Sequence, residues 1–185
     1  SGKISSGGFN IGRLFNNSQL GNLALNGKIK GSGFTLKDLN ADFEGTIQQL
    51  EYSGYPYQNI TLNGTFVQGL FKGRLDMDDP NLKIEDLNGS INLAGDKTEF
   101  NFDANLQRAN LQQLNFSKDN FTLSGLLKLN FVGNNIDNFL GTAKIYDASL
   151  LHDSTRLSFD SLSLNSFTDG ENKVLSFRSN EIEGN

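Results

Sequence analysis

The fold is decided by a stretch that reads Ile60-Thr-Leu62-Asn-Gly64-Thr-Phe66 and continues as Phe71-Lys-Gly73-Arg-Leu75. In both parts apolar residues alternate with polar ones, and a glycine replaces one apolar residue. Because side chains on a β-strand alternate between its two faces, each glycine points to the same face as its apolar neighbours. The stretch therefore predicts strands with one apolar face. On that face the glycines leave a place where two walls approach closely or another group can sit.

The apolar-x-Gly-x-apolar phrase recurs along the chain, at Leu25–Ile29, Phe43–Ile47, Leu62–Phe66, Phe71–Leu75, Leu87–Ile91, Leu123–Leu127 and Phe139–Ala143. Several of its glycines are about 16 to 19 residues apart, which is the length of two strands with their turns. Between the alternating stretches lie short polar segments of Gly, Asn and Asp, residues that tolerate tight turns. We therefore expect an antiparallel meander of about ten strands, near 23–31, 41–51, 58–66, 69–77, 82–93, 98–109, 120–132, 138–150, 156–166 and 173–182.

The domain organisation has two parts. We expect residues 21–185 to form one repetitive antiparallel β segment of a larger protein, elongated and partly open, with a closed β-sandwich as the alternative. Residues 1–20 are expected to be a flexible or capping segment, because Ser5-Ser6-Gly7-Gly8 is flexible in composition. The following Ile11-Gly-Arg-Leu14-Phe15 could be a short helix, a strand or a cap.

The composition excludes several functions. The 185 residues contain no cysteine, so there is no disulfide, thiolate nucleophile or cysteine metal site. The net charge is −5 and no basic patch is present, which disfavours a nucleic-acid partner. No apolar run approaches the roughly 20 residues of a membrane-spanning helix. Because the chain begins at Ser1 without methionine, we expect a segment of a longer protein, and any anchor or targeting segment would lie outside it.

Catalytic groups are sparse. The single histidine, His152, is followed by Asp153 and Ser154, but no nucleophile elbow surrounds them and the segment is typical of a turn before a strand. Glu181 and Glu183 share a strand face and are interpreted as a solubilising edge rather than a glycosidase pair. We expect a protein that is not an enzyme and that has no cofactor or metal.

Two polar clusters leave alternatives open. Asp76-Met-Asp78-Asp79-Pro80-Asn81 carries oxygen ligands that suit calcium, but it lacks the spacing of an EF-hand loop, and an Asx turn is the simpler interpretation. Tyr52, Tyr55 and Tyr57 flank a proline and could form an aromatic platform for a sugar, as in a carbohydrate-binding β-sandwich. Cross-strand packing explains the same tyrosines.

A family resemblance rests on the stretches Gly33-Phe34-Thr-Leu36-Lys-Asp-Leu39-Asn-Ala41-Asp-Phe43-Glu-Gly45, Leu50-Glu-Tyr52-Ser-Gly54-Tyr-Pro-Tyr57-Gln-Asn59-Ile60-Thr-Leu62-Asn-Gly64, Phe71-Lys-Gly73-Arg-Leu75, Asp79-Pro80-Asn81 and Ala109-Asn-Leu111-Gln-Gln-Leu114. Roughly residues 20–165 resemble the repetitive β region of TamB-type translocation and assembly proteins of the AsmA-like superfamily, in its Asn- and Tyr-rich Bacteroidetes-like form. The resemblance implies an open, taco-like β-groove in the periplasm of a Gram-negative cell. It also implies an inner-membrane anchor and a role in outer-membrane biogenesis.

Under this resemblance the concave apolar face holds phospholipid acyl chains and passes them between the inner and outer membranes. Alternation in this sequence assigns the lining to Ile29, Ile47, Leu62, Gly64, Phe66, Leu75, Gly89, Ile91, Leu93, Phe102, Leu123, Leu129 and Ile145. Each buried methylene would contribute about 0.8 kcal/mol, and the force is nondirectional, so a chain could slide without meeting one deep well. One alternative is a scaffold or chaperone for outer-membrane β-barrel assembly proteins that acts by strand addition. The carbohydrate-binding sandwich is another.

Overall fold

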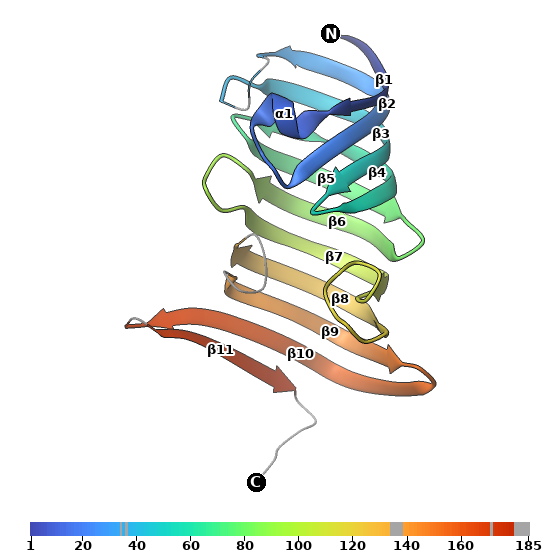
Figure 1. The fold of residues 1–185 in the computed structure, drawn as a ribbon, viewed down its shortest axis with the longest axis vertical. Coiled ribbons are helices and arrows are strands. Elements are labelled where there is room, and N and C mark those ends of the chain that lie inside the picture. Colours follow the sequence, from blue (N-terminus) through green and yellow to red (C-terminus); the bar gives the residue numbers. More distant parts are fainter. Residues whose placement is uncertain (34, 36, 134–138, 171, 180–185) are drawn as a thin grey trace.

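The computed structural model describes residues 1–33, 35, 37–133, 139–170 and 172–179. The chain forms one sheet of eleven strands in sequence order, and every neighbouring pair is antiparallel. Figure 1 shows the strands lying across the long axis, from β1 at the N-terminal end to β11 at the C-terminal end. The elements are β1 (Gly2–Asn10), α1 (Ile11–Phe15), β2 (Leu20–Ser32), β3 (Asn40–Tyr52), β4 (Tyr55–Val67), β5 (Leu70–Asp78), β6 (Leu82–Asn92), β7 (Glu99–Asn110), β8 (Phe121–Val132), β9 (Leu140–His152), β10 (Thr155–Asp169) and β11 (Asn172–Ser179).

The predicted fold class is confirmed. All ten predicted strands are present as β2 to β11, with ends within about three residues of the expected ones where these are described. Residues 138 and 180–182, at the ends of two predicted strands, lie outside the described residues. The alternative of a closed β-sandwich is wrong, because the described residues form a single sheet in which the first and last strands, β1 and β11, do not pair.

Residues 1–20, expected to be a flexible or capping segment, contain an additional strand, β1, and the helix α1. β1 pairs with β2, with a register shift between Ser6 and Phe9. Ile4 and Phe9 pack against buried residues of β2 to β5, so apolar alternation outweighs the flexible composition of the segment. In α1, the Asn10 side chain caps the helix by accepting a hydrogen bond from the Arg13 amide at 2.8 Å. The helical alternative for residues 11–15 is thus confirmed.

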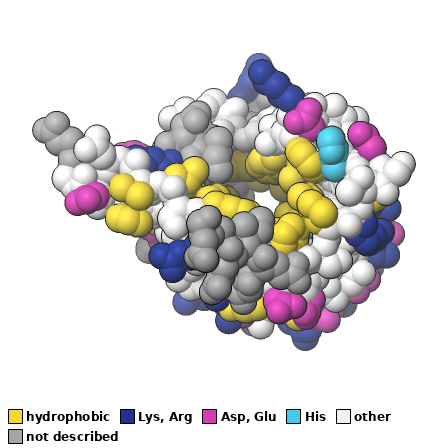
Figure 2. All heavy atoms as spheres, turned by 90° about the horizontal axis from the view of Figure 1, so that it is seen from below, with side chains coloured by type: hydrophobic (Ala, Val, Ile, Leu, Met, Phe, Trp, Pro, Cys, Tyr) yellow, Lys and Arg dark blue, Asp and Glu magenta, His cyan; other side chains and the backbone are white. Residues whose placement is uncertain are grey.

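The strands curl around the long axis, so that the sheet encloses a hollow (Figure 2). Register shifts mark β-bulges in the pairs β2–β3, β5–β6, β6–β7, β7–β8 and β8–β9. Asn59, Asp86 and Asp147 lie in strand interiors with φ of 52°, 52° and 48°, a left-handed conformation that Asn and Asp tolerate. Asp86 and Asp147 fall within the register shifts of β6 and β9, and because a bulge bends its strand and increases its twist, these two positions help to form the corner around which the sheet curls.

The inward glycines allow neighbouring strands to approach closely. Gly64, Gly73 and Gly89 lie directly opposite one another on β4, β5 and β6. A Cβ built on Gly64 would lie 2.5 Å from the carbonyl oxygen of Lys72 and would overlap the ring of Phe71. The gap that the sequence predicted on the apolar face is therefore already filled by an aromatic ring of the same sheet.

Two clusters of apolar side chains fill much of the curled sheet. The N-terminal cluster consists of the buried residues Leu23, Leu25, Phe43, Ile47, Ile60, Leu62 and Phe71. The C-terminal cluster consists of the buried residues Ile84, Leu87, Ala104, Leu106, Ala109, Leu114, Ile145, Ala148 and Leu162. Tyr57, Leu75 and Met77 pack against both clusters, so the apolar interior is continuous along the molecule.

Candidate functional site

The candidate site is the concave apolar face of the sheet, which we call the groove. Twelve of the thirteen predicted lining residues lie in strands, and register and clustering place them on this face. Leu93 lies just after β6, and its amide donates to the Gly69 carbonyl at 2.8 Å. Ile47, Leu62 and Ile145 are buried, whereas the others are half-buried. The predicted set therefore forms one surface, partly sealed and partly accessible.

The groove is accessible at its C-terminal end. Leu175 and Phe177 of β11 are 51% and 64% exposed, and they pair with Ser166 and Leu164 of β10. Leu164 and Ser166 follow the buried Leu162 at two-residue steps, so all of these side chains point to the concave face. Viewed from this end, Figure 2 shows hydrophobic side chains around a central hollow.

The two lips of the groove meet toward the N-terminal end. β3 and β7 run in the same direction, so Tyr52 at the end of β3 and Thr98 just before β7 belong to opposite lips. Their side chains are joined by a hydrogen bond. Burial raises the pKa of Tyr52, and hydrogen bonds to Ser53 and Thr98 partly offset this. Next to this contact, a pocket of about 670 Å³ separates residues 16–19 from the loops of the other lip.

A row of phenylalanines runs along one lip. Ring centroids are 5.0 Å apart for Phe66 and Phe71, 4.7 Å for Phe100 and Phe131, and 4.8 Å for Phe131 and Phe139. Of these five residues, only Phe66 was in the predicted lining. Phe71, Phe100 and Phe131 follow the same alternation within their strands, and Phe139 lies at the start of the predicted strand 138–150, so the pattern could have found them. They give the groove one largely aromatic wall.

The loop between β7 and β8, residues 111–120, also contributes to the interior. Leu114 is only 4% exposed and belongs to the C-terminal cluster, although it lies on no strand. Leu111 packs against the same cluster. Strand periodicity could not predict this contribution, because the loop has none.

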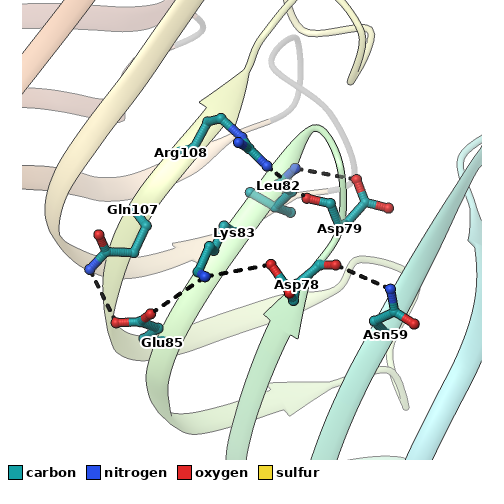
Figure 3. Close-up of polar contacts among 8 residues, drawn as sticks. All are labelled: Asn59, Asp78, Asp79, Leu82, Lys83, Glu85, Gln107 and Arg108. Carbon is teal, nitrogen blue, oxygen red and sulfur yellow. Dashed lines mark hydrogen bonds and ion pairs between the residues drawn. The ribbon is translucent and has the colours of Figure 1, made fainter.

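The acidic residues at the β5–β6 turn make contacts within the sheet, and Figure 3 shows those of Asp79 with Leu82 and of Asp78 with Lys83. The carboxylate of Asp79, a residue that is 1% exposed, accepts a hydrogen bond from the Tyr55 hydroxyl at 2.6 Å. It also accepts hydrogen bonds from the backbone amides of Asn81 at 2.8 Å and Gln58 at 3.1 Å. The Leu82 amide donates to the same carboxylate at 3.2 Å. This geometry favours the Asx-turn interpretation over a calcium loop.

The neighbouring acids of this turn point elsewhere. Asp78 lies 3.6 Å from the Lys83 ammonium, and Asp76 accepts a hydrogen bond from the Asp86 amide at 2.8 Å. In the part of the chain that the structure describes, no three acidic or histidine side chains come together as a group that could hold a metal ion.

The tyrosines do not form an open platform. Tyr55 and Tyr57 are half-buried, their ring centroids are 4.7 Å apart in an edge-to-face arrangement, and both pack against the C-terminal cluster. Burial raises the pKa of Tyr57 to about 12, with smaller contributions from Tyr52, Tyr55 and Asp79. The packing interpretation thus accounts for these residues better than a sugar platform does.

His152 and its neighbours show no catalytic geometry. The His152 ring stacks on Phe121 with centroids 4.5 Å apart, and its Nε2 lies 3.8 Å from a carboxylate oxygen of Asp153. Asp153 and Ser154 form the exposed turn between β9 and β10, as the sequence predicted. Glu181 and Glu183 lie outside the described residues.

Comparison with protein-family models, curated proteins and solved structures finds no significant match. Within the described ranges, no helix has the length and apolar character needed to cross a membrane. The site must therefore be interpreted from its own geometry.

Proposed function

We propose that this chain is a segment of a periplasmic, TamB-like envelope protein that is anchored in the inner membrane. Its groove would hold phospholipid acyl chains during passive transfer between the inner and outer membranes. The observation that carries the proposal is the continuous apolar interior of a single open sheet, with large hydrophobic side chains exposed on its concave face at one end. Isolated surface hydrophobics are common, but clustering on one concave face is typical of a binding surface.

The chemistry of the lining fits an acyl chain rather than a polar ligand. The inward positions are almost all aliphatic or aromatic, and such a surface binds through area rather than through directed hydrogen bonds. A bound chain with ten buried methylenes would gain about 8 kcal/mol before the entropic cost of ordering it. Because this gain hardly changes with position, a chain could move along the groove in small steps.

A second function is favoured by the edge strand β11. Its outer edge pairs with no described strand, and it carries the exposed Leu175 and Phe177. An extended segment of an outer-membrane protein could add here as a twelfth strand. Strand capture would protect the amides of β11 from hydrogen exchange when an alternating peptide is added, whereas lipid binding alone would leave this edge exchanging.

The proposal is tested by native mass spectrometry and lipid extraction on protein purified without detergent. The test variant carries Leu175→Ser and Phe177→Ser on the concave face. Its matched control is Phe167→Ser on β10, because Phe167 is equally exposed but follows the inward Ser166 and points to the opposite face. We expect the amount of copurified phospholipid to fall about fivefold or more in the double variant and to stay unchanged in the control. Wild-type protein without lipid, or equal losses in both variants, would contradict the proposal.

A further inference from the structure

The loop of residues 111–120 is held together by its own hydrogen bonds. The Phe116 and Ser117 amides both donate to the Leu111 carbonyl, at 2.8 and 3.0 Å, and the Gln112 side chain donates to the Lys118 carbonyl at 2.8 Å. At its base, the Asn110 side chain accepts from the Gln113 amide at 3.1 Å. Among the described residues, the hydrogen bonds of this loop stay within it or reach only the adjoining ends of β7 and β8. The loop is therefore a compact unit.

The loop packs against the groove through the apolar side chains of Leu111 and Leu114. Leu114, on the inner side of the loop, packs in the C-terminal cluster with residues from β6, β7, β9 and β10. Leu111 packs beside it, whereas Phe116 on the outer side is 73% exposed. An interface with no hydrogen bond to the opposite strands can be replaced by any apolar group of similar size, because the hydrophobic effect is nondirectional.

The position of Leu114 matters for a ligand. Its cluster lies between the N-terminal cluster and the exposed Leu175 and Phe177 at the C-terminal end. A chain passing along the groove from one end to the other has to cross the level of β7 to β9, where the Leu114 side chain already contacts the floor. The isobutyl group of Leu114 occupies space that the methylenes of an acyl chain would need.

We propose that residues 111–120 form a gate in the groove, with Leu114 as a plug that an incoming acyl chain displaces. This inference rests on the proposed function and concerns how entry of the acyl chain into the groove is controlled. The compact loop swings outward as a unit about its two attachments, Asn110 and Phe121, and the acyl chain replaces the contacts of Leu111 and Leu114. Opening of the loop then limits the rate at which an acyl chain enters the C-terminal half of the groove, because the acyl chain and the Leu114 side chain cannot occupy the same space.

The absence of cysteine from the chain allows a direct test by single thiols. Leu114→Cys places a thiol on the plug, and Phe116→Cys places a matched control on the exposed side of the same loop. Reaction with a maleimide is measured with and without saturating oleate, and oleate binding is measured separately by native mass spectrometry. We expect Cys at 114 to react at least tenfold faster with oleate, while the control changes less than about twofold.

A second variant removes the plug without adding a reactive group. Leu114→Ala should speed the loading of a fluorescent fatty acid at least tenfold, by order of magnitude, and Leu111→Ala should act in the same direction. Circular dichroism confirms that each variant keeps its β content. If oleate binds but the reactivity of the Leu114→Cys thiol and the loading rate of Leu114→Ala are unchanged, the gate is refuted, whereas lipid binding in the groove is supported. Failure of oleate to bind to wild type and Leu114→Ala alike overturns both.

Discussion

Replacement of Asp79 by asparagine should destabilise the sheet strongly, although the two side chains have nearly the same shape. The buried carboxylate accepts from four donors, three of them on Oδ1 and the Gln58 amide on Oδ2. Asparagine keeps one acceptor oxygen and places an NH₂ group against the Gln58 amide. The variant loses one charge-assisted hydrogen bond, at about 1.5 to 3 kcal/mol, and leaves buried donors facing each other, at about 1 to 3 kcal/mol.

The two contributions together predict a loss of about 2.5 to 6 kcal/mol, which is roughly 5 to 24 °C in Tm for a chain of this size. Urea unfolding followed by circular dichroism measures the free energy, and differential scanning calorimetry measures Tm. The control is Asp78→Asn, whose side chain is exposed and lies 3.6 Å from Lys83, and which should change stability by less than about 0.5 kcal/mol. An Asp79→Asn variant within 1 kcal/mol of wild type would refute the view that this carboxylate ties the turn to β4.

Three further predictions concern Gly64, Tyr57 and the Asp79 turn. Gly64→Ala should cost about 2 kcal/mol in urea unfolding, because its Cβ would overlap the Phe71 ring and a neighbouring carbonyl, whereas Gly7→Ala, with open space around it, should cost less than 1 kcal/mol. The raised pKa of Tyr57, about 12 against 10 when unfolded, means that the folded state holds the phenol proton more tightly, so stability present below pH 10 should fall between pH 10 and 12. Tyr57→Phe should flatten that fall in a pH series of Tm. Millimolar calcium should leave Tm unchanged, because N–H and O–H donors already occupy the Asp79 carboxylate; a saturable rise in Tm would reverse this interpretation.

Strand positions could be predicted from the sequence because the alternation of apolar residues is nearly continuous from β2 to β11. β1 was missed because Ser5, Ser6 and the following glycines dilute its alternation, and only Ile4 and Phe9 carry the apolar signal. Leu114 was missed for a different reason. A loop residue is buried only when the whole sheet curls toward it. This burial depends on tertiary packing, which the local periodicity of the sequence does not indicate.

The curvature of the sheet is indicated in the sequence by breaks in the two-residue alternation. In a regular strand inward residues are two apart, but Tyr57 and Ile60, Ile84 and Leu87, and Ile145 and Ala148 are inward pairs three apart. In β6 and β9 the three-residue step coincides with a register shift, so one extra residue is accommodated there as a β-bulge, whereas β4 keeps its register with both neighbours.

The residues inside these steps include Asn59, Asp86 and Asp147, which adopt the left-handed conformation that the bend needs. Such steps recur in β4, β6 and β9, and bends in several strands fold a flat sheet into a groove. The shape of the groove is therefore encoded less by its lining than by the polar residues at its corner. Replacing Asp147 by valine, which tolerates a positive φ poorly, should open the curl and expose Ile145 and Ala148 to hydrogen exchange while leaving the strand pattern intact. Unchanged exchange at these two amides would show that the lining alone imposes the curvature.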